Sequence, residues 1–152
     1  MPGYASPLLA ATLLAMLSFS ALGAEVSIGD PYARAVPPGQ ANSAVFMSLE
    51  NQTGENQALV GAESAVSEVV ELHTHVEEDG MMRMRRIEKI EIPAGETVTL
   101  KPGGLHVMLI GLKQPLEPGD MVDLALTFED GSRIPVQAPV RRIEVPMQRT
   151  AH

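Results

Sequence analysis

The clearest structural signal in the sequence is Met121-Val122-Asp123-Leu124-Ala125-Leu126-Thr127-Phe128. Its large apolar residues stand at every second position: Val122, Leu124, Leu126 and Phe128. Because successive side chains of a β-strand point to opposite faces, this period predicts a strand with one buried face. Asp130-Gly131 follows and predicts a tight hairpin with a primed turn, leading into another strand.

The rest of the chain repeats this pattern of short apolar segments separated by turn residues. Proline and glycine clusters, which favour turn dihedral angles, stand between the segments, and no long segment has a helical period. Further strands are predicted at 43–49, 58–62, 69–76, 81–87, 97–100, 106–112 and 133–138. We therefore expect a single all-β domain, a Greek-key β-sandwich or barrel of seven to nine strands.

The N-terminal segment differs in composition from this domain. Residues 7–24 carry no charge, and an apolar run at 8–17 is followed by small residues. This pattern predicts a signal peptide at 1–24, cleaved near Gly23 or Ala24, although the segment has no Lys or Arg before the apolar run. The alternative is an uncleaved membrane anchor. The exported protein would then contain a domain at 25–140 and a short polar tail at 141–152.

Charge and cysteine content exclude several classes of function. The formal net charge is −8, which disfavours binding to nucleic acid phosphates and favours a basic partner surface. The chain has no cysteine, so it has neither disulfide bonds nor a thiolate for catalysis or metal binding. No Ser-His-Asp arrangement, carboxylate dyad or phosphate-binding loop stands out, and we do not expect an enzyme.

Histidine and methionine are concentrated in one part of the chain. The chain has four histidines and nine methionines, and many of them lie between positions 72 and 110: His73, His75, Met81, Met82, Met84, His106 and Met108. Methionine commonly fills gaps in a core, and this is what we expect of Met47 and Met121.

The spacing of these residues places several on common faces. His106 and Met108 are two residues apart on a predicted strand, so they share one face. The same holds for His73 and His75. If the strands at 69–76 and 81–87 form a hairpin, His73 can lie close to Met84.

Two imidazoles and two thioethers form a soft, neutral set of ligands. Thioether sulfur favours copper(I) over zinc, magnesium or calcium. Without cysteine, the set cannot form a His2Cys blue-copper centre, and zinc would favour cysteine, more histidine or carboxylates.

The arrangement H-x10-M-x21-H-x-M, formed by His73, Met84, His106 and Met108, resembles the motif of the periplasmic copper chaperone family PCuAC. The surrounding sequence is similar too, including Glu71-Leu72-His73, Gly80-Met81-Met82-Arg83-Met84-Arg85 and Leu100-Lys101-Pro102-Gly103-Gly104-Leu105-His106-Val107-Met108. The resemblance covers about residues 30–140.

This resemblance implies a cupredoxin-like sandwich that binds one copper(I) ion per chain at His73, Met84, His106 and Met108. It further implies a periplasmic carrier that delivers copper to the CuA centre of cytochrome c oxidase. The expected partner is the CuA-bearing subunit or a thiol-containing copper-relay protein, and we expect a monomer. In the tail only Met147 and His152 could bind metal, so a strong tail site is not expected. Whether His75, Met81 or Met82 lends a transient ligand stays open.

Two alternatives remain at this point. The first is a zinc or copper(II) storage or sensing module that uses Glu71, His73, His75 and Glu77 on one strand face. The second is a purely structural sandwich in which all methionines belong to the core and no metal binds.

Overall fold

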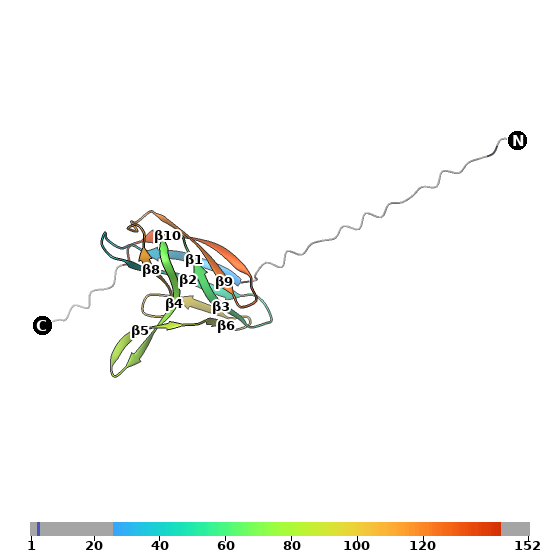
Figure 1. Ribbon diagram of the computed structural model, residues 1–152. Coiled ribbons are helices and arrows are strands. Elements are labelled where there is room, and N and C mark those ends of the chain that lie inside the picture. The colour runs from blue at the N-terminus through green and yellow to red at the C-terminus, as the bar shows by residue number, and fades with distance from the viewer. Residues whose placement is uncertain (1–2, 4–25, 144–152) are drawn as a thin grey trace.

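The computed structural model describes Gly3 and residues 26–143, which form one β-rich body with a projecting hairpin (Figure 1). The described residues contain ten strands and no helix. The strands are β1 (Val26–Arg34), β2 (Asn42–Asn51), β3 (Gln57–Glu63), β4 (Ser67–Glu78), β5 (Met81–Ile87), β6 (Ile90–Ile92), β7 (Thr97–Leu100), β8 (His106–Leu112), β9 (Met121–Phe128) and β10 (Arg133–Arg141).

The count of ten strands exceeds the predicted seven to nine because β1 and β6 were not predicted. β1 contains Gly29, Asp30 and Pro31, which are residue types that favour turns. In the structure they lie within the strand, where the regular pairing of β1 with β2 is interrupted. β6 has only three residues, too few to show a period.

The strands form two antiparallel sheets. One has the order β5-β4-β8-β2-β1, with β7 also pairing with β2, and the other has the order β10-β9-β3-β6. A short parallel pairing of β1 with β10, at Ala33–Val140 and Arg34–Arg141, joins the two sheets. Apolar residues from both sheets pack into one core cluster, which confirms the predicted all-β sandwich.

Burial along β9 confirms the alternation seen in the sequence. Val122, Leu124, Leu126 and Phe128 are all buried. Met47 on β2 is 1% exposed and belongs to the core, as predicted. The prediction for Met121 is wrong, because this side chain is 52% exposed. It precedes the inward-facing Val122 and therefore points to the opposite face of the strand.

Two hairpin turns have different geometry. Between β4 and β5, Asp79 and Gly80 both have positive φ, at 50° and 75°, and Glu78 pairs with Met81. These are the features of a two-residue type I′ turn. In the loop between β9 and β10, Gly131 has positive φ and Asp130 does not. The amide of Phe128 donates to the carbonyl of Ser132. The primed turn predicted there is therefore wrong, since the loop has three residues and ends on a left-handed glycine.

The predicted signal peptide at 1–24, apart from Gly3, and most of the predicted tail at 141–152 lie outside the described residues. In the part of the chain that the structure describes, no helix is long and apolar enough to cross a membrane.

Candidate metal centre

The innermost pair of candidate ligands lies at the start of β8. His106 is buried, with 2% of its surface exposed, and Met108 is partly buried. Their neighbours Val107 and Leu109 face the core and are fully buried. His106 and Met108 therefore share the face of the sheet that points away from the core, as their spacing predicts.

The turn before β8 orients the imidazole of His106. In Lys101-Pro102-Gly103-Gly104, the Gly104 amide donates to the Lys101 carbonyl at 3.0 Å, and Gly103 has φ of 83°. Proline at the second position and a left-handed glycine at the third fit a type II turn. The turn places the Gly104 carbonyl 2.9 Å from Nδ1 of His106. A carbonyl only accepts, so Nδ1 carries the proton and Nε2 keeps a free lone pair.

The neighbouring strand β4 brings two more imidazoles to this face. His73 pairs with His106 across the β4–β8 ladder, and the two ring centroids are 5.8 Å apart. The ring centroid of His75 lies 5.3 Å from that of His106. His106 therefore has two histidine neighbours rather than one.

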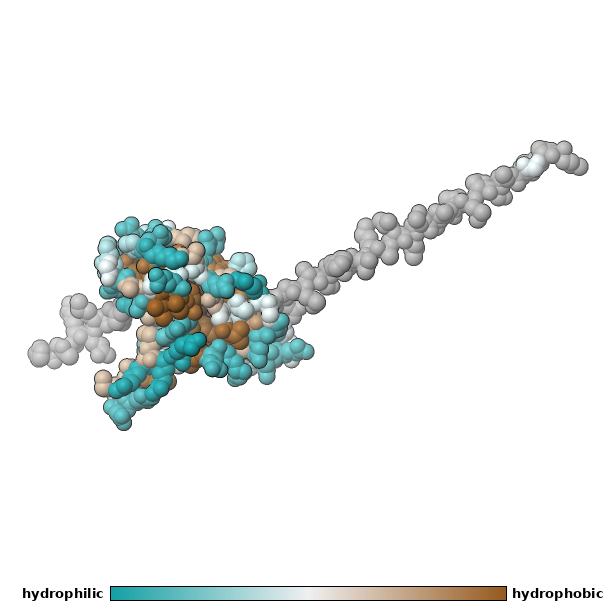
Figure 2. Space-filling view, viewed as in Figure 1, coloured by the Kyte–Doolittle hydropathy of each residue, from teal (hydrophilic) through white to brown (hydrophobic). Residues whose placement is uncertain are grey.

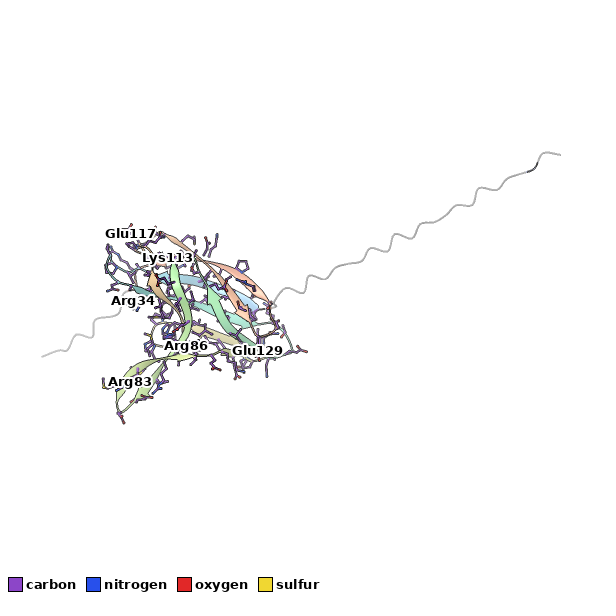
Figure 3. All side chains as sticks on the ribbon, in the orientation of Figure 1. Arg34, Arg83, Arg86, Lys113, Glu117 and Glu129 are labelled. Carbon is purple, nitrogen blue, oxygen red and sulfur yellow. The ribbon has the colours of Figure 1, made fainter. Side chains whose placement is uncertain are left out.

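Met84 enters the site from the edge strand β5. The predicted hairpin forms, but Met84 lies directly opposite His75, and His73 lies opposite Arg86. Met84 is 45% exposed. Figure 3 shows the labelled Arg86 at the root of the projecting hairpin and Arg83 farther out along it.

A cavity of about 500 Å³ joins several of these side chains. Met84, His106 and Met108 line it together with His75, and its walls include Arg34, Phe46 and Pro102. His73 does not line it. Three of the four predicted ligands thus share one cavity, and the fourth, His73, is next to His106 but does not line the cavity.

His73 has an unusual set of contacts. Its Nε2 lies 2.7 Å from Oε2 of Glu71, and Oε1 of Glu71 lies 3.7 Å from Nε of Arg86. A carboxylate only accepts, so Nε2 of His73 donates. Nδ1 of His73 is buried and has no hydrogen-bond partner among the described residues. Such a nitrogen is costly to bury unless something binds its lone pair.

The electrostatics of the site favour a neutral His106. Burial lowers the pKa of the His106 imidazole below its ordinary value of 6.5, and the neighbouring His75 and His73 lower it further. The Gly104 carbonyl opposes this shift by accepting from the ring. A neutral imidazole is the form that binds a metal.

The carboxylate–histidine set of the alternative site does not assemble. Among the described residues, no three His, Cys, Asp or Glu side chains are placed to hold one metal ion. Glu71, His73, His75 and Glu77 follow one another along a single strand face, where successive members are about 7 Å apart. Among these four residues, the one side-chain hydrogen bond joins Glu71 and His73.

The remaining methionines of this region lie outside the cavity. Met81 and Met82 are exposed near the tip of the hairpin, and neither lines the cavity. In Figure 2 the hairpin is mainly hydrophilic, with pale brown atoms along it, and darker apolar atoms gather near its root. These exposed methionines show that the alternative in which all methionines form core is wrong.

The sequence did not indicate one residue of the site, Phe46, and the pairing of His75 with Met84 was not predicted. Phe46 on β2 has its ring centroid 6.2 Å from that of His106 and lines the cavity. Only strand pairing brings Phe46 here, so no local pattern indicates it. The opposition of His75 and Met84 did have a signal, because a two-residue turn at Asp79-Gly80 fixes the register of the whole hairpin.

The model of the LpqE-like lipoprotein family matches residues 26–140. The chain is 39% identical over 104 residues to Lxx21020 of Leifsonia xyli subsp. xyli, a relative whose name describes it as a lipoprotein. The match covers 68% of this chain and 63% of that relative, so the chain spans less than two thirds of the relative's length.

Solved structures with a similar fold come from copper-binding domains. The solution structure of CuI-DR1885 from Deinococcus radiodurans is 35% identical, with a TM-score of 0.65, covering 80% of this chain and 82% of that one. The copper-bound PCuAC domain from PmoF2 is 25% identical, with a TM-score of 0.67, covering 78% and 94%. These matches confirm the predicted cupredoxin-like fold. Since the family model spans most of the sequence, this chain belongs to the LpqE-like lipoprotein family.

Proposed function

We propose that the chain is an exported copper chaperone that holds one copper(I) ion with His73, Met84, His106 and Met108. The observation that carries the proposal is the pair of buried His106 and partly buried Met108, which lines a cavity together with Met84. An imidazole with a free nitrogen and two thioethers at one cavity form a set suited to copper(I).

The donor atoms fit this ion. Nε2 of His106 and Nδ1 of His73 are both free to bind, the latter being buried without a partner among the described residues. All four ligands are uncharged, so the ligand set itself adds no negative charge that would favour a higher oxidation state. The absence of cysteine protects the site from disulfide formation in an oxidising compartment.

The comparisons support the same function. CuI-DR1885 and the copper-bound domain from PmoF2 share the fold and are named for the copper that they bind. Lipoprotein names among the relatives support export, and the N-terminal pattern supports the periplasm. The names of these domains mention copper and no catalytic activity. The proposed role is therefore copper binding and transfer.

The position of Met84 suits a carrier that must also release its ion. Met84 is 45% exposed and lies on the edge strand, whereas His106 is buried. An incoming thiolate is a stronger soft donor than a thioether, and it would displace Met84 first. We propose the CuA-bearing subunit of cytochrome c oxidase, or a thiol-containing relay protein, as the receiver.

A copper(I) titration of the purified chain against a competing chelator tests this function. We expect one ion per chain, and Met108→Ala should weaken the affinity strongly. The matched control is Met47→Ala, which should cost about 2–5 kcal/mol of stability through a core cavity and leave the affinity of the folded protein unchanged. Equal losses of affinity in the two variants would refute the assignment of Met108.

Two further measurements separate the alternatives. Zinc added in competition should not displace copper(I), because thioethers bind zinc poorly. A site built from Glu71, His73, His75 and Glu77 would instead prefer zinc or copper(II). Transfer of copper(I) to a purified CuA domain or to a dithiol relay protein, followed by NMR, tests delivery. A chain that keeps its copper in the presence of both receivers is not their donor.

A further inference from the structure

Two imidazoles of this site share one hydrogen-bond acceptor. The Gly104 carbonyl lies 2.9 Å from Nδ1 of His106 and 3.3 Å from Nδ1 of His75. A carbonyl oxygen has two lone pairs and can accept from both rings. Both Nδ1 atoms then carry protons, and both Nε2 atoms keep free lone pairs. The Lys101–Gly104 turn therefore prepares His75 and His106 in the same way.

His75 also stands beside the two thioethers. It lies directly opposite Met84 in the β4–β5 ladder, and it lines the same cavity as Met84, His106 and Met108. Its ring centroid is 5.3 Å from that of His106, slightly closer than the 5.8 Å of His73. The cavity thus contains a complete set of two imidazoles and two thioethers without His73.

His73 is held in a different environment. Its Nε2 contacts Glu71, and its buried Nδ1 lacks a partner among the described residues. Within β4 it stands two positions before His75 and on the same face. Strand β4 therefore presents two histidines to His106, of which His75 lines the cavity and His73 does not, its Nδ1 being buried.

We propose that His75 is a second, exchangeable histidine ligand, so that copper(I) binds in two alternative sets that share Met84, His106 and Met108. This inference rests on the proposed function. Copper(I) arriving through the cavity meets His75 first, and replacement of His75 by His73 moves the ion inward. Release follows the reverse order. While one histidine replaces the other, the ion keeps at least three protein ligands, Met84, His106 and Met108. The exchange involves no change of oxidation state and no bond except those to the metal.

A double-mutant cycle tests this exchange. Copper(I) affinity is measured by chelator competition for the wild type, His73→Ala, His75→Ala and the double variant. If either histidine can complete the set, each single variant loses affinity about tenfold or less, and the double variant loses at least about tenfold more than the product of the two. Thr74→Ala, between the two histidines on the opposite face of β4, is the matched control and should bind like the wild type.

Either of two results in this cycle would overturn the exchange. If His73→Ala binds as weakly as the double variant, His75 is not a ligand, and if His75→Ala does so, His73 does not replace it. Imidazole ¹⁵N NMR of the wild type needs no variant to fold. Metal-free His75 should carry its proton on Nδ1, and copper(I) should shift its Nε2 resonance. An unshifted Nε2 refutes the inference. Failure of the wild type to bind copper(I) would instead refute the proposed function.

Discussion

At the scale of single residues, His106 links metal binding to protein stability. Its pKa is lowered chiefly by burial, so the unfolded chain binds a proton more readily than the folded protein does. Stability from this residue is therefore fully present above the ordinary histidine pKa of about 6.5. This contribution to stability is lost as the pH falls from the ordinary histidine pKa toward the lowered pKa of the folded state. Below the lowered pKa, no further stability is lost.

The prediction is that the metal-free chain loses stability between pH 7 and pH 5, and that His106→Gln loses less over the same range. Urea unfolding at several pH values measures both, and the difference between the two curves isolates His106 from the other titrating groups. Parallel curves for the two proteins would show that His106 does not titrate as its burial requires.

At the scale of elements, the β4–β5 hairpin positions two cavity residues through its turn. Gly80 has φ of 75°, and the register that it sets places His75 opposite Met84. Gly131 has φ of 86° in the β9–β10 loop, which does not line the cavity. No atom outside the neighbouring residues lies within 4 Å of a Cβ added at either glycine. Alanine at either position therefore introduces similar backbone strain, about 1–2 kcal/mol.

We expect Gly80→Ala to weaken copper(I) binding with little loss of global stability, because the hairpin projects from the core (Figure 1). Gly131→Ala should lower the unfolding temperature and leave the affinity of the folded chain unchanged, because β9 and β10 carry core residues. Thermal unfolding without metal and chelator competition with copper(I) measure the two effects. The opposite pattern would show that the hairpin register does not matter for the site.

At the scale of the whole molecule, copper(I) should stabilise the fold by binding only the folded state. Its proposed ligands come from β4, β5 and β8, three adjacent strands of one sheet. At a free copper(I) concentration one hundred times the dissociation constant, the gain is about 2.7 kcal/mol. Because the chain has no cysteine, the reductant that maintains copper(I) cannot itself alter the stability of the metal-free protein through a disulfide.

The measurement is the unfolding temperature with and without copper(I), for the wild type and for Met108→Ala. The wild type should unfold several degrees higher with copper(I), and the variant should lose most of this increase. An equal increase in both proteins would place the bound copper outside the proposed site.

The sequence by itself determined the features that depend on local order along the chain. Alternation in β9 predicted its buried face, and the spacing of His106 and Met108 predicted that they share a face, because side chains alternate strictly along a strand. The same rule places Met121 outside, where its apolar character had suggested core. The Asp79-Gly80 turn contained enough information to pair His75 with Met84, since a two-residue loop fixes the hairpin register.

Only the tertiary structure decided which distant segments meet. His73 pairs with His106 across strands that are separated by β5, β6 and β7 in the sequence, and no turn residue fixes that register. The Gly104 carbonyl next to His75 and the ring of Phe46 next to His106 likewise arise from pairing between separate strands and loops. Such pairing depends on how the two sheets close over a common core, which is a property of the whole chain rather than of any local segment.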